Sequence, residues 1–315
     1  MQASPNIQAL LKTRTDLSEY FVETGNRPQN FIQENEPEER FKDYPKTQEL
    51  LKMKNALLKK RNHPPMYLKS DIREIDFANF PKFDVVLIDP PWEEYKKRIL
   101  NISMVKRTEK SEGWTLEEIR DIRLDQIAAS PSFIFLWCGS EHLDHGRLLF
   151  KHWGIKRCED VVWIKSNIYT NKYNPSHADD YSFLKRTKEH CLVGIKGDTK
   201  RASEPSFIHP NIDTDVIMTE EPDIETFDKP EELYEIIERF CLGRRRIELF
   251  GNNKSIRPGW FTIGKDLSTS NFNTGVYESW FEGDVRLDGY QGGKITGTTP
   301  EIESLRPKSP PKQNN

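Results

Sequence analysis

Seven short apolar runs divide the middle of this 315-residue chain, and several of them are rich in Val, Ile and Phe. They lie at 85–89, 133–138, 161–164, 191–195, 216–218, 247–250 and 261–263. Runs of this length are too short for buried helices and are typical of central strands. Helical segments alternate with them near 115–122, 141–153 and 230–241. This alternation predicts an α/β domain with a mostly parallel sheet and helices on both faces.

The two ends of the chain have a different character. Residues 1–36 are polar and lack periodicity, which predicts an extended arm that needs another surface to hold it. Apolar residues at helical spacing predict a helix within 38–61, broken or late-starting because Pro45 is tolerated only in a first turn. Residues 266–300 are weakly patterned and are predicted to be loops, and a basic, proline-rich tail follows. We therefore expect an arm and helix at 1–62, an α/β domain at 63–265 and an extension at 266–315.

Composition excludes several classes of protein. Charged residues make up 31% and hydrophobic residues 35%, which is the balance of a globular protein. No run approaches the roughly 18 apolar residues that span a bilayer, and the N-terminus lacks a signal peptide's apolar run, so no membrane partner is expected. Four cysteines, none in a C-x-x-C pair, argue against a disulfide framework and against a metal site of the zinc-finger type. A net charge of −3 excludes a uniformly basic nucleic-acid coat.

The first long strand runs directly into Asp89-Pro90-Pro91-Trp92. Ligands of open α/β sheets bind at the carboxyl ends of strands, where this motif falls. The Asp89 carboxylate and a proline carbonyl can accept the two hydrogens of an exocyclic amine, and Trp92 can stack on the attached ring. These groups suit the recognition of an adenine or cytosine amino group and its methylation by S-adenosylmethionine, which is mostly a matter of positioning. The alternative is a Pro-Pro turn that leaves a strand, with the aspartate as a cap.

The methyl donor needs a second loop, because the chain contains no G-x-G-x-x-G motif. The absence of that motif also disfavours a dehydrogenase. The candidate loop follows the strand that ends in Phe250-Gly251. An amine-binding motif on an early strand and a glycine on a late strand predict a circularly permuted methyltransferase sheet.

Several segments resemble the eukaryotic mRNA N6-adenosine methyltransferases. Besides the motif at 89–92, they are the block 186–197 and the helix start at 229–232. Within that group the chain most resembles the methyltransferase-like fourteen family, the RNA-binding non-catalytic subunits. The diagnostic segments are 23–32, 64–68, 133–140, 257–260 and 305–311. The similarity extends from about residue 17 to residue 312.

This resemblance implies a Rossmann-type, class I methyltransferase fold and a heterodimer with a catalytic sister subunit. It also implies mRNA as the polymer bound, nuclear localisation, and further adaptor proteins of the same complex. S-adenosylmethionine would serve the complex and be bound by the partner. The arm, the first helix and the tail would brace the domain and its partner.

The resemblance also separates the two halves of the site. The subunit family usually carries Glu-Pro-Pro-Leu, whereas Asp89–Trp92 here is like the catalytic sister. In the donor loop, Asn252-Asn253-Lys254-Ser255 replaces the sister's Arg-Pro-His-Asn, and Lys265-Asp266 replaces its Asn-Gln. The donor's adenine would contact Asp71 and Ile72, and its ribose Lys229; both subunit types share these residues. The acceptor edge is thus expected to be intact and the donor pocket dismantled.

Basic residues cluster around the helix near 141–153. By resemblance, an RNA groove would be lined by Arg147, Lys151, Lys156, Arg157, Lys185 and Arg186. The partner-facing positions would be Asp144, Arg147, Arg186 and Ser309. The alternative is an ordinary solvated helix face. For the arginine triplet at 244–246 we expect a solvated or partner-facing turn.

Three functions therefore remain open. The first is an RNA-binding, structural and activating subunit of an adenosine N6-methyltransferase. The second is a catalyst in its own right, acting on RNA or DNA adenine through Asp89, Pro90 and Trp92. The third is a transcription or meiosis factor that keeps only the fold.

Overall fold

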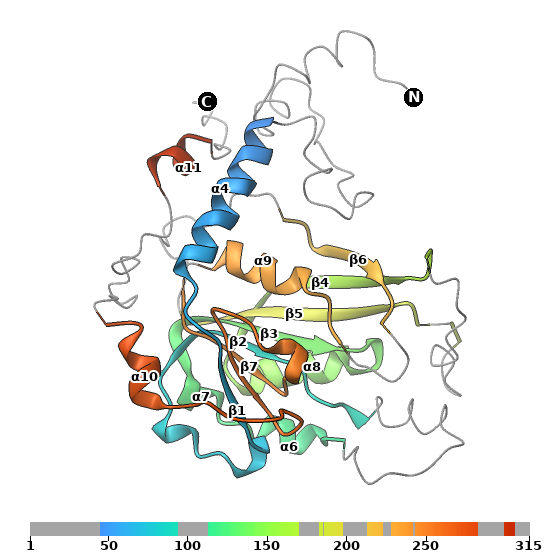
Figure 1. Cartoon of the computed structure of the whole chain (residues 1–315). Helices are drawn as coiled ribbons and strands as arrows, with labels where there is room; N and C mark the ends of the chain where they lie inside the picture. Colours follow the sequence, from blue (N-terminus) through green and yellow to red (C-terminus); the bar gives the residue numbers. More distant parts are fainter. Residues whose placement is uncertain are drawn as a thin grey trace, which may run out of the picture.

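Eight strands form one sheet in the order β1-β8-β7-β2-β3-β5-β4-β6 (Figure 1). The structure is a computed structural model that describes residues 45–93, 113–169, 183–184, 186–197, 213–222, 228–241, 243–282 and 299–305. Strand β5 is antiparallel to β3 and β4, and the other neighbours are parallel. The predicted mostly parallel α/β sheet is confirmed.

All seven apolar runs are strands, and an eighth strand precedes them. The strands are β1 Met66–Lys69, β2 Phe83–Ile88, β3 Ala128–Cys138, β4 Lys156–Ser166, β5 Lys188–Lys196, β6 Val216–Glu220, β7 Arg246–Leu249 and β8 Phe261–Gly264. The α-helices are α4 Pro45–Arg61, α6 Leu116–Arg120, α7 Leu124–Ile127, α8 Leu143–His152, α9 Glu232–Phe240, α10 Thr274–Ser279 and α11 Pro300–Leu305. The short 3-10 helices are η2 Ile72–Glu74, η3 Phe77–Asn79, η4 Ser140–His142 and η6 Asn253–Ser255.

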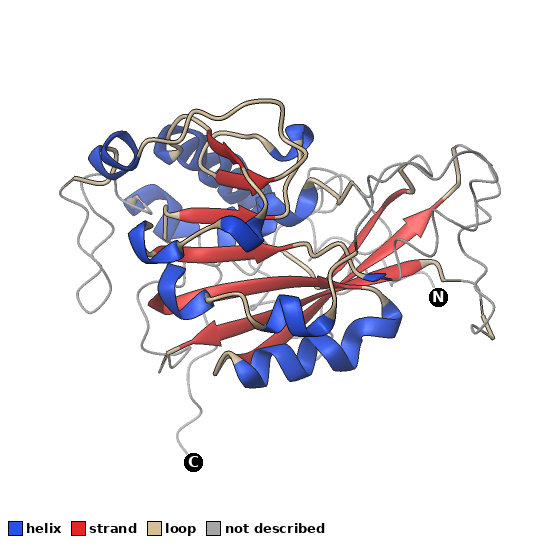
Figure 2. Ribbon diagram, turned by 90° about the horizontal axis from the view of Figure 1, so that it is seen from below, coloured by secondary structure: helices blue, strands red, loops and turns tan. Residues whose placement is uncertain are grey.

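Apolar side chains leave both faces of the sheet, because successive residues of a buried strand point to opposite sides. On one face Val86 and Ile88 of β2 belong to a core that includes residues of α6 and α8. On the other face Val85 and Leu87 belong to a core that includes Leu233 and other residues of α9. Figure 2 shows the strands as one continuous twisted sheet with helices packed along it. Helices on both faces, as predicted, close the sheet off from water.

The helix expected within 38–61 is present as α4, and residues 38–44 lie outside the described part of the chain. α4 packs against α11 through Leu50, Leu51 and Ile302 (Figure 1). The prediction of loops over 266–300 is wrong for α10, whose Tyr277 is fully buried. The C-terminal part of the chain therefore contributes to the core as well as to the surface.

One edge of the sheet is covered by the chain itself. The backbone N–H of Tyr67 donates to Asn271 Oδ1 over 2.7 Å, and the Asn271 N–H donates to the Tyr67 carbonyl over 3.0 Å. The Lys69 N–H donates to Ser270 Oγ over 2.8 Å, and the Asn271 side-chain amide donates to the carbonyl of Pro65. These bonds use the groups of β1 that an open edge strand would present to another chain.

The expectation of a solvated turn at Arg244, Arg245 and Arg246 is wrong. The three residues are 5%, 8% and 1% exposed. They lie where β7 begins, covered by the end of α4 and by α10, two elements that are remote in the sequence.

Candidate functional site

The motif that follows β2 lies at the carboxyl edge of the sheet, between β7 and β3. Ile88 is paired with Leu249, so Asp89 lies beside the Phe250-Gly251 turn. The Asp89 N–H donates to the Leu249 carbonyl over 3.3 Å. The permuted strand order thus brings the acceptor motif and the glycine loop together, as expected from the sequence.

Trp92 does not offer the stacking face that the sequence suggested. Its ring is 2% exposed, stacks on His142 with ring centroids 4.6 Å apart, and donates from Nε1 to the Trp137 carbonyl over 2.9 Å. Both proline carbonyls also have donors already: Pro90 accepts from the Trp92 N–H and Pro91 from the Trp114 N–H. These groups hold the motif in place instead of facing an incoming base.

The Asp89 carboxylate is held by a lysine from the other end of the domain. Lys229 Nζ lies 3.2 Å from Asp89 Oδ1 and 3.2 Å from Glu189 Oε2. Lys165 Nζ lies 2.6 Å from Glu189 Oε1 and 3.9 Å from Glu221 Oε1. The lysine that was expected to reach a donor ribose therefore fills the acceptor edge, as part of a buried chain of five charges.

The charge states follow from this arrangement. Burial raises the pKa of Asp89 to about 6; the Lys229 ammonium opposes the rise, and the Glu189 carboxylate adds to it. Burial disfavours the charged form of Lys229, but its two carboxylate neighbours outweigh that effect and raise its pKa. One ammonium shared between two carboxylates leaves Asp89 incompletely compensated, so the two directions agree.

A second buried carboxylate lies under the glycine turn. Glu248 is 3% exposed and accepts from the Tyr234 hydroxyl over 2.9 Å. Burial raises the pKa of Glu248 to about 7, with Tyr234 and Ser255 opposing the rise through hydrogen bonds. A Cβ on Gly251 would approach the Glu248 carboxyl carbon to 3.3 Å and Thr262 Cγ2 to 2.3 Å. The turn is closely packed from below, which leaves glycine as the residue that fits.

The residues above this turn interact with each other. Asn252 caps η6, accepting from the Lys254 N–H over 2.8 Å. Lys254 Nζ forms an ion pair with Asp228, and Asn253 Nδ2 donates to Ser268 Oγ over 2.8 Å. Phe250 adopts a φ of 71°, a left-handed conformation uncommon for a residue with a side chain. The loop is ordered by its own contacts.

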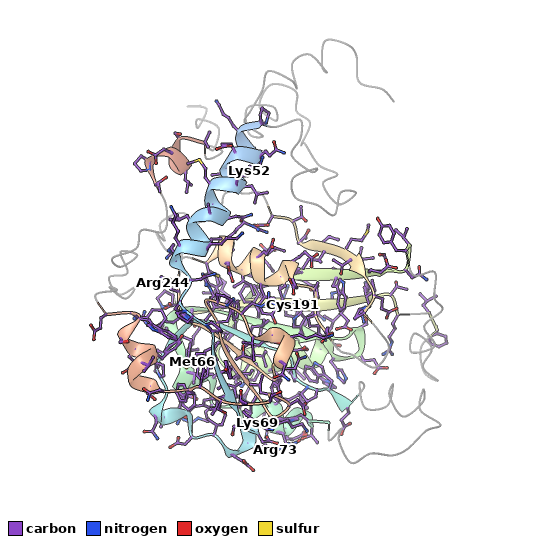
Figure 3. All side chains as sticks on the ribbon, in the orientation of Figure 1. Lys52, Met66, Lys69, Arg73, Cys191 and Arg244 are labelled. Carbon is purple, nitrogen blue, oxygen red and sulfur yellow. The ribbon has the colours of Figure 1, made fainter. Side chains whose placement is uncertain are left out.

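The position expected to contact the donor's adenine is also engaged. Asp71 Oδ1 accepts from the Arg73 N–H over 2.9 Å, and its Oδ2 lies 3.2 Å from Arg73 Nη1. The Arg73 guanidinium lies 4.2 Å from the centroid of the Trp114 ring and donates to Glu118 over 2.9 Å. Ile72 is buried. Figure 3 shows Arg73 close to Lys69, at the end of the molecule away from α4.

These contacts do not fit S-adenosylmethionine. The donor would need free acceptors for its ribose hydroxyls and a carboxylate for its amino group. Asp71, Asp89 and Asp228 are the carboxylates near the places where it would lie, and each is paired with a cation of this chain.

The predicted basic residues lie on and beside α8. Arg147 and Lys151 are one turn apart on α8, and exposed Lys156 and Arg157 begin β4. Arg147 Nη1 lies 2.7 Å from Asp144 Oδ1, so two positions expected to face a partner pair with each other. Arg186 forms an ion pair with Glu141 of η4. Lys185 and Ser309 lie outside the described residues.

Sequence reasoning missed Glu189 and Lys165. Both stand in strands, on residues that flank apolar runs, and a charge inside a buried strand is itself a sign of an internal ion pair. Within the described ranges, no group of three or more His, Cys, Asp or Glu is placed to hold a metal ion. In the same ranges no helix is long and apolar enough to cross a membrane.

Comparison with known proteins places these features in a family. Residues 83–266 match the MT-A70 family. The chain is 46% identical over 310 residues to the "N(6)-adenosine-methyltransferase non-catalytic subunit METTL14" of Xenopus tropicalis, covering 97% of this chain and 64% of that protein. The Drosophila melanogaster protein of the same name is 46% identical over 301 residues, 94% of this chain and 72% of that protein.

More distant similarity reaches the other subunit. The "N(6)-adenosine-methyltransferase catalytic subunit METTL3" of Homo sapiens is 32% identical over 207 residues, 66% of this chain and 32% of that protein. The chain spans a little under two thirds of the length of its Xenopus relatives. A match over the whole α/β domain, and over nearly the entire chain for the first group, shows that the chain belongs to the MT-A70 family and, within it, to the METTL14 family.

Proposed function

We propose that this chain is the RNA-binding, structural and activating subunit of a heterodimeric adenosine N6-methyltransferase. Its partner would be a sister subunit of the METTL3 type, the polymer mRNA and the compartment the nucleus, with further adaptor proteins in the same complex. The relatives that cover most of this chain are named as non-catalytic subunits of such an enzyme. Membership of a methyltransferase family implies S-adenosylmethionine as the methyl donor. In this proposal the partner binds it.

One observation supports the proposal above all others: Lys229 occupies the Asp89 carboxylate. Methyl transfer to an amine requires acceptors that hold the amino hydrogens and aim the nitrogen lone pair at the methyl group. Here an internal ammonium takes the place of the amine, and it is itself held by Glu189. Displacing it would leave three charges buried without their partners, at a cost of several kcal/mol.

The donor loop supports the same conclusion independently. The sister's arginine and histidine are replaced at 252–255, and Lys254 is paired with Asp228. Each hydrogen bond lost to the donor weakens binding by about 1–3 kcal/mol, and about 1.4 kcal/mol corresponds to a factor of ten. Two or three lost bonds reduce the affinity by orders of magnitude.

The basic residues give the chain a role toward RNA. Lys151, Lys156 and Arg157 are exposed. Such side chains bind phosphates through a salt-dependent attraction that does not distinguish sequence. Binding of this kind would hold the polymer while the partner's site selects the adenine.

Calorimetry on the purified chain tests the central claim. We expect no saturable binding of S-adenosylmethionine by this chain alone. In the reconstituted pair, Asp89→Ala should leave most methylation intact, whereas the corresponding change in the partner should abolish it. Asp121→Ala, at an exposed carboxylate, is the matched control. Saturable micromolar donor binding by the chain alone would contradict the proposal.

The second candidate is a chain that catalyses on its own. It is favoured by Asp89, which is the catalytic sister's residue and lies beside the Phe250-Gly251 turn. It requires Lys229 to leave the acceptor edge when an adenine enters. Methylation of an adenine-containing oligonucleotide by the chain alone, lost in Asp89→Asn, would establish it.

Salt dependence tests the RNA groove. Arg147→Glu combined with Arg157→Glu should weaken RNA binding by the pair and flatten the plot of log affinity against log salt concentration. Arg123→Glu, an exposed arginine that pairs with Asp125, is the control. An unchanged slope would exclude the groove, and loss of both RNA and partner binding in the unaltered chain would favour a factor that keeps only the fold.

A further inference from the structure

The arginines that lead into β7 are buried against neutral groups. Arg246 Nη1 donates to Asn62 Oδ1 over 3.1 Å and lies 3.4 Å from the Gly259 carbonyl. Arg244 Nε donates to the carbonyl of Arg61, the last residue of α4, over 3.0 Å. Figure 3 shows Arg244 at the lower end of α4. We call Arg61 and Arg244–Arg246 the arginine cluster.

Some donors around this cluster have no acceptor. They are Nη1 of Arg245, Nε and Nη2 of Arg246 and the hydroxyl of Tyr277, all shielded from solvent. A buried donor without an acceptor costs about 1–3 kcal/mol, and more when it is charged. Such groups in a folded protein indicate that something else accepts their hydrogens.

Aromatic rings from α10 and its end close the cluster. The Arg245 guanidinium lies 4.6 Å from the centroid of the Phe281 ring, and that of Arg244 lies 5.3 Å from it. His63 stacks on Trp280 at 4.9 Å and meets the edge of Tyr277 at 5.4 Å. Burial, helped by the nearby arginines, lowers the pKa of His63 to about 4, so this imidazole is neutral at pH 7.

The charges at this place do not balance within the described residues. Four guanidinium groups converge there, and the carboxylate bonded to the triplet is that of Asp84, which accepts from the Arg245 N–H over 3.1 Å. A water molecule would accept a hydrogen but would not neutralise the excess positive charge. Burying uncompensated cations is expensive, so the missing acceptor is expected to carry negative charge.

We propose that the arginine cluster binds a small oxyanion of the phosphate class. A tetrahedral oxyanion offers several acceptor oxygens at once, and the planar fork of arginine matches pairs of them. A halide offers a single acceptor atom. The site lies at the start of β7, whereas Gly251 and the methyltransferase motif lie beyond its end, so the anion serves the structure and does not depend on the function proposed above.

Thermal unfolding of the full chain tests this site. Increasing sodium phosphate, compared with sodium chloride at equal ionic strength, should raise Tm by about 5 °C when phosphate exceeds its dissociation constant 100-fold. Arg246→Met should abolish the difference between the two salts. Arg123→Met, which removes an exposed arginine, should keep it. Equal shifts in both salts would overturn the proposal.

A measurement on the unaltered protein covers the case in which Arg246→Met fails to fold. Native mass spectrometry after exchange into phosphate should show one bound anion per chain, released on unfolding. Adenosine monophosphate, in which the phosphate is an ester, should not replace inorganic phosphate, because the site is enclosed. Equal binding of the ester would mean an open, nucleotide-accepting surface, and no bound anion would mean that water serves the orphan donors; either result rejects the proposal.

Discussion

Buried charge is stabilised in opposite ways at the two ends of β2 and β7. At the carboxyl ends, Asp89 and Glu189 face the ammonium of Lys229, so negative and positive groups alternate. At the amino ends, guanidinium groups are held by carbonyls, an amide and aromatic rings. The first end is closed to a ligand because its charges satisfy each other. The second end is positive within the described residues, which is the property of a site that needs a ligand.

The largest effect should come from removing the shared ammonium. Lys229→Met leaves Asp89 and Glu189 buried without it, and should lower the free energy of unfolding by about 3–5 kcal/mol in urea denaturation. Lys151→Met, on the exposed face of α8, should have little effect. Adding Asp89→Asn to Lys229→Met should restore part of the loss. A loss below about 1 kcal/mol would show that the two ends do not differ in this way.

The pH dependence of stability sharpens the comparison at the carboxyl end. The pKa of Glu248 rises from 4.5 to about 7 on folding, so the folded state holds this proton more tightly than the unfolded chain. Its stabilising contribution is complete below pH 4.5 and is lost as the pH rises to 7. Asp89, raised from 3.8 to about 6, acts in the same direction.

Glu248→Gln should therefore flatten the fall in stability between pH 5 and pH 8 by at most about 3 kcal/mol, because the amide still accepts from Tyr234 and no longer titrates. Urea denaturation at several pH values measures it. Identical profiles for the variant and the unaltered protein would place the titrating group elsewhere.

A close backbone approach distinguishes the amino end. A Cβ on Gly243 would lie 2.2 Å from Cβ of Asp84, so Gly243→Ala should cost about 1–3 kcal/mol through overpacking. Gly275→Ala is the control, since the nearest atom to its Cβ would be Asn273 Oδ1 at 3.5 Å. Equal stability of the two variants in thermal denaturation would mean that Asp84 can move aside.

The smallest effect belongs to the exposed pair above the glycine turn. The Lys254 side chain is 71% exposed, so Lys254→Ala should change the free energy of unfolding by less than about 1 kcal/mol in urea. A larger loss would show that the ion pair with Asp228 orders the whole donor loop.

Much of the fold follows from local pattern, and the exceptions have physical reasons. The seven apolar runs are strands because each is buried on both faces, which leaves a continuous apolar stretch. β1 has only four residues and alternates Met66 and Leu68 with Tyr67 and Lys69, so it offers no such stretch. α10 is a helix because Tyr277 docks against His63 and Phe83, residues from far earlier in the chain.

The site was predictable in place but not in contacts. The carboxyl end of β2 and the glycine turn of β7 were expected to meet, and they do. The pairing of Asp89 with Lys229 was not foreseen, because 140 positions separate them in the chain and either residue has an ordinary role alone. Burial of Arg246 was missed for the same reason, since α4 provides its cover.

The covered edge of β1 has a consequence for assembly. Because Asn271 and Ser270 already take up the groups of β1, a second sheet cannot extend this one there. Within the described residues, β6 pairs only with β4, so its far side is where a foreign strand has room. A sheet that accepts a neighbour on one side alone forms a pair and then stops. This architecture permits a dimer and, by blocking its other flank, prevents a fibre.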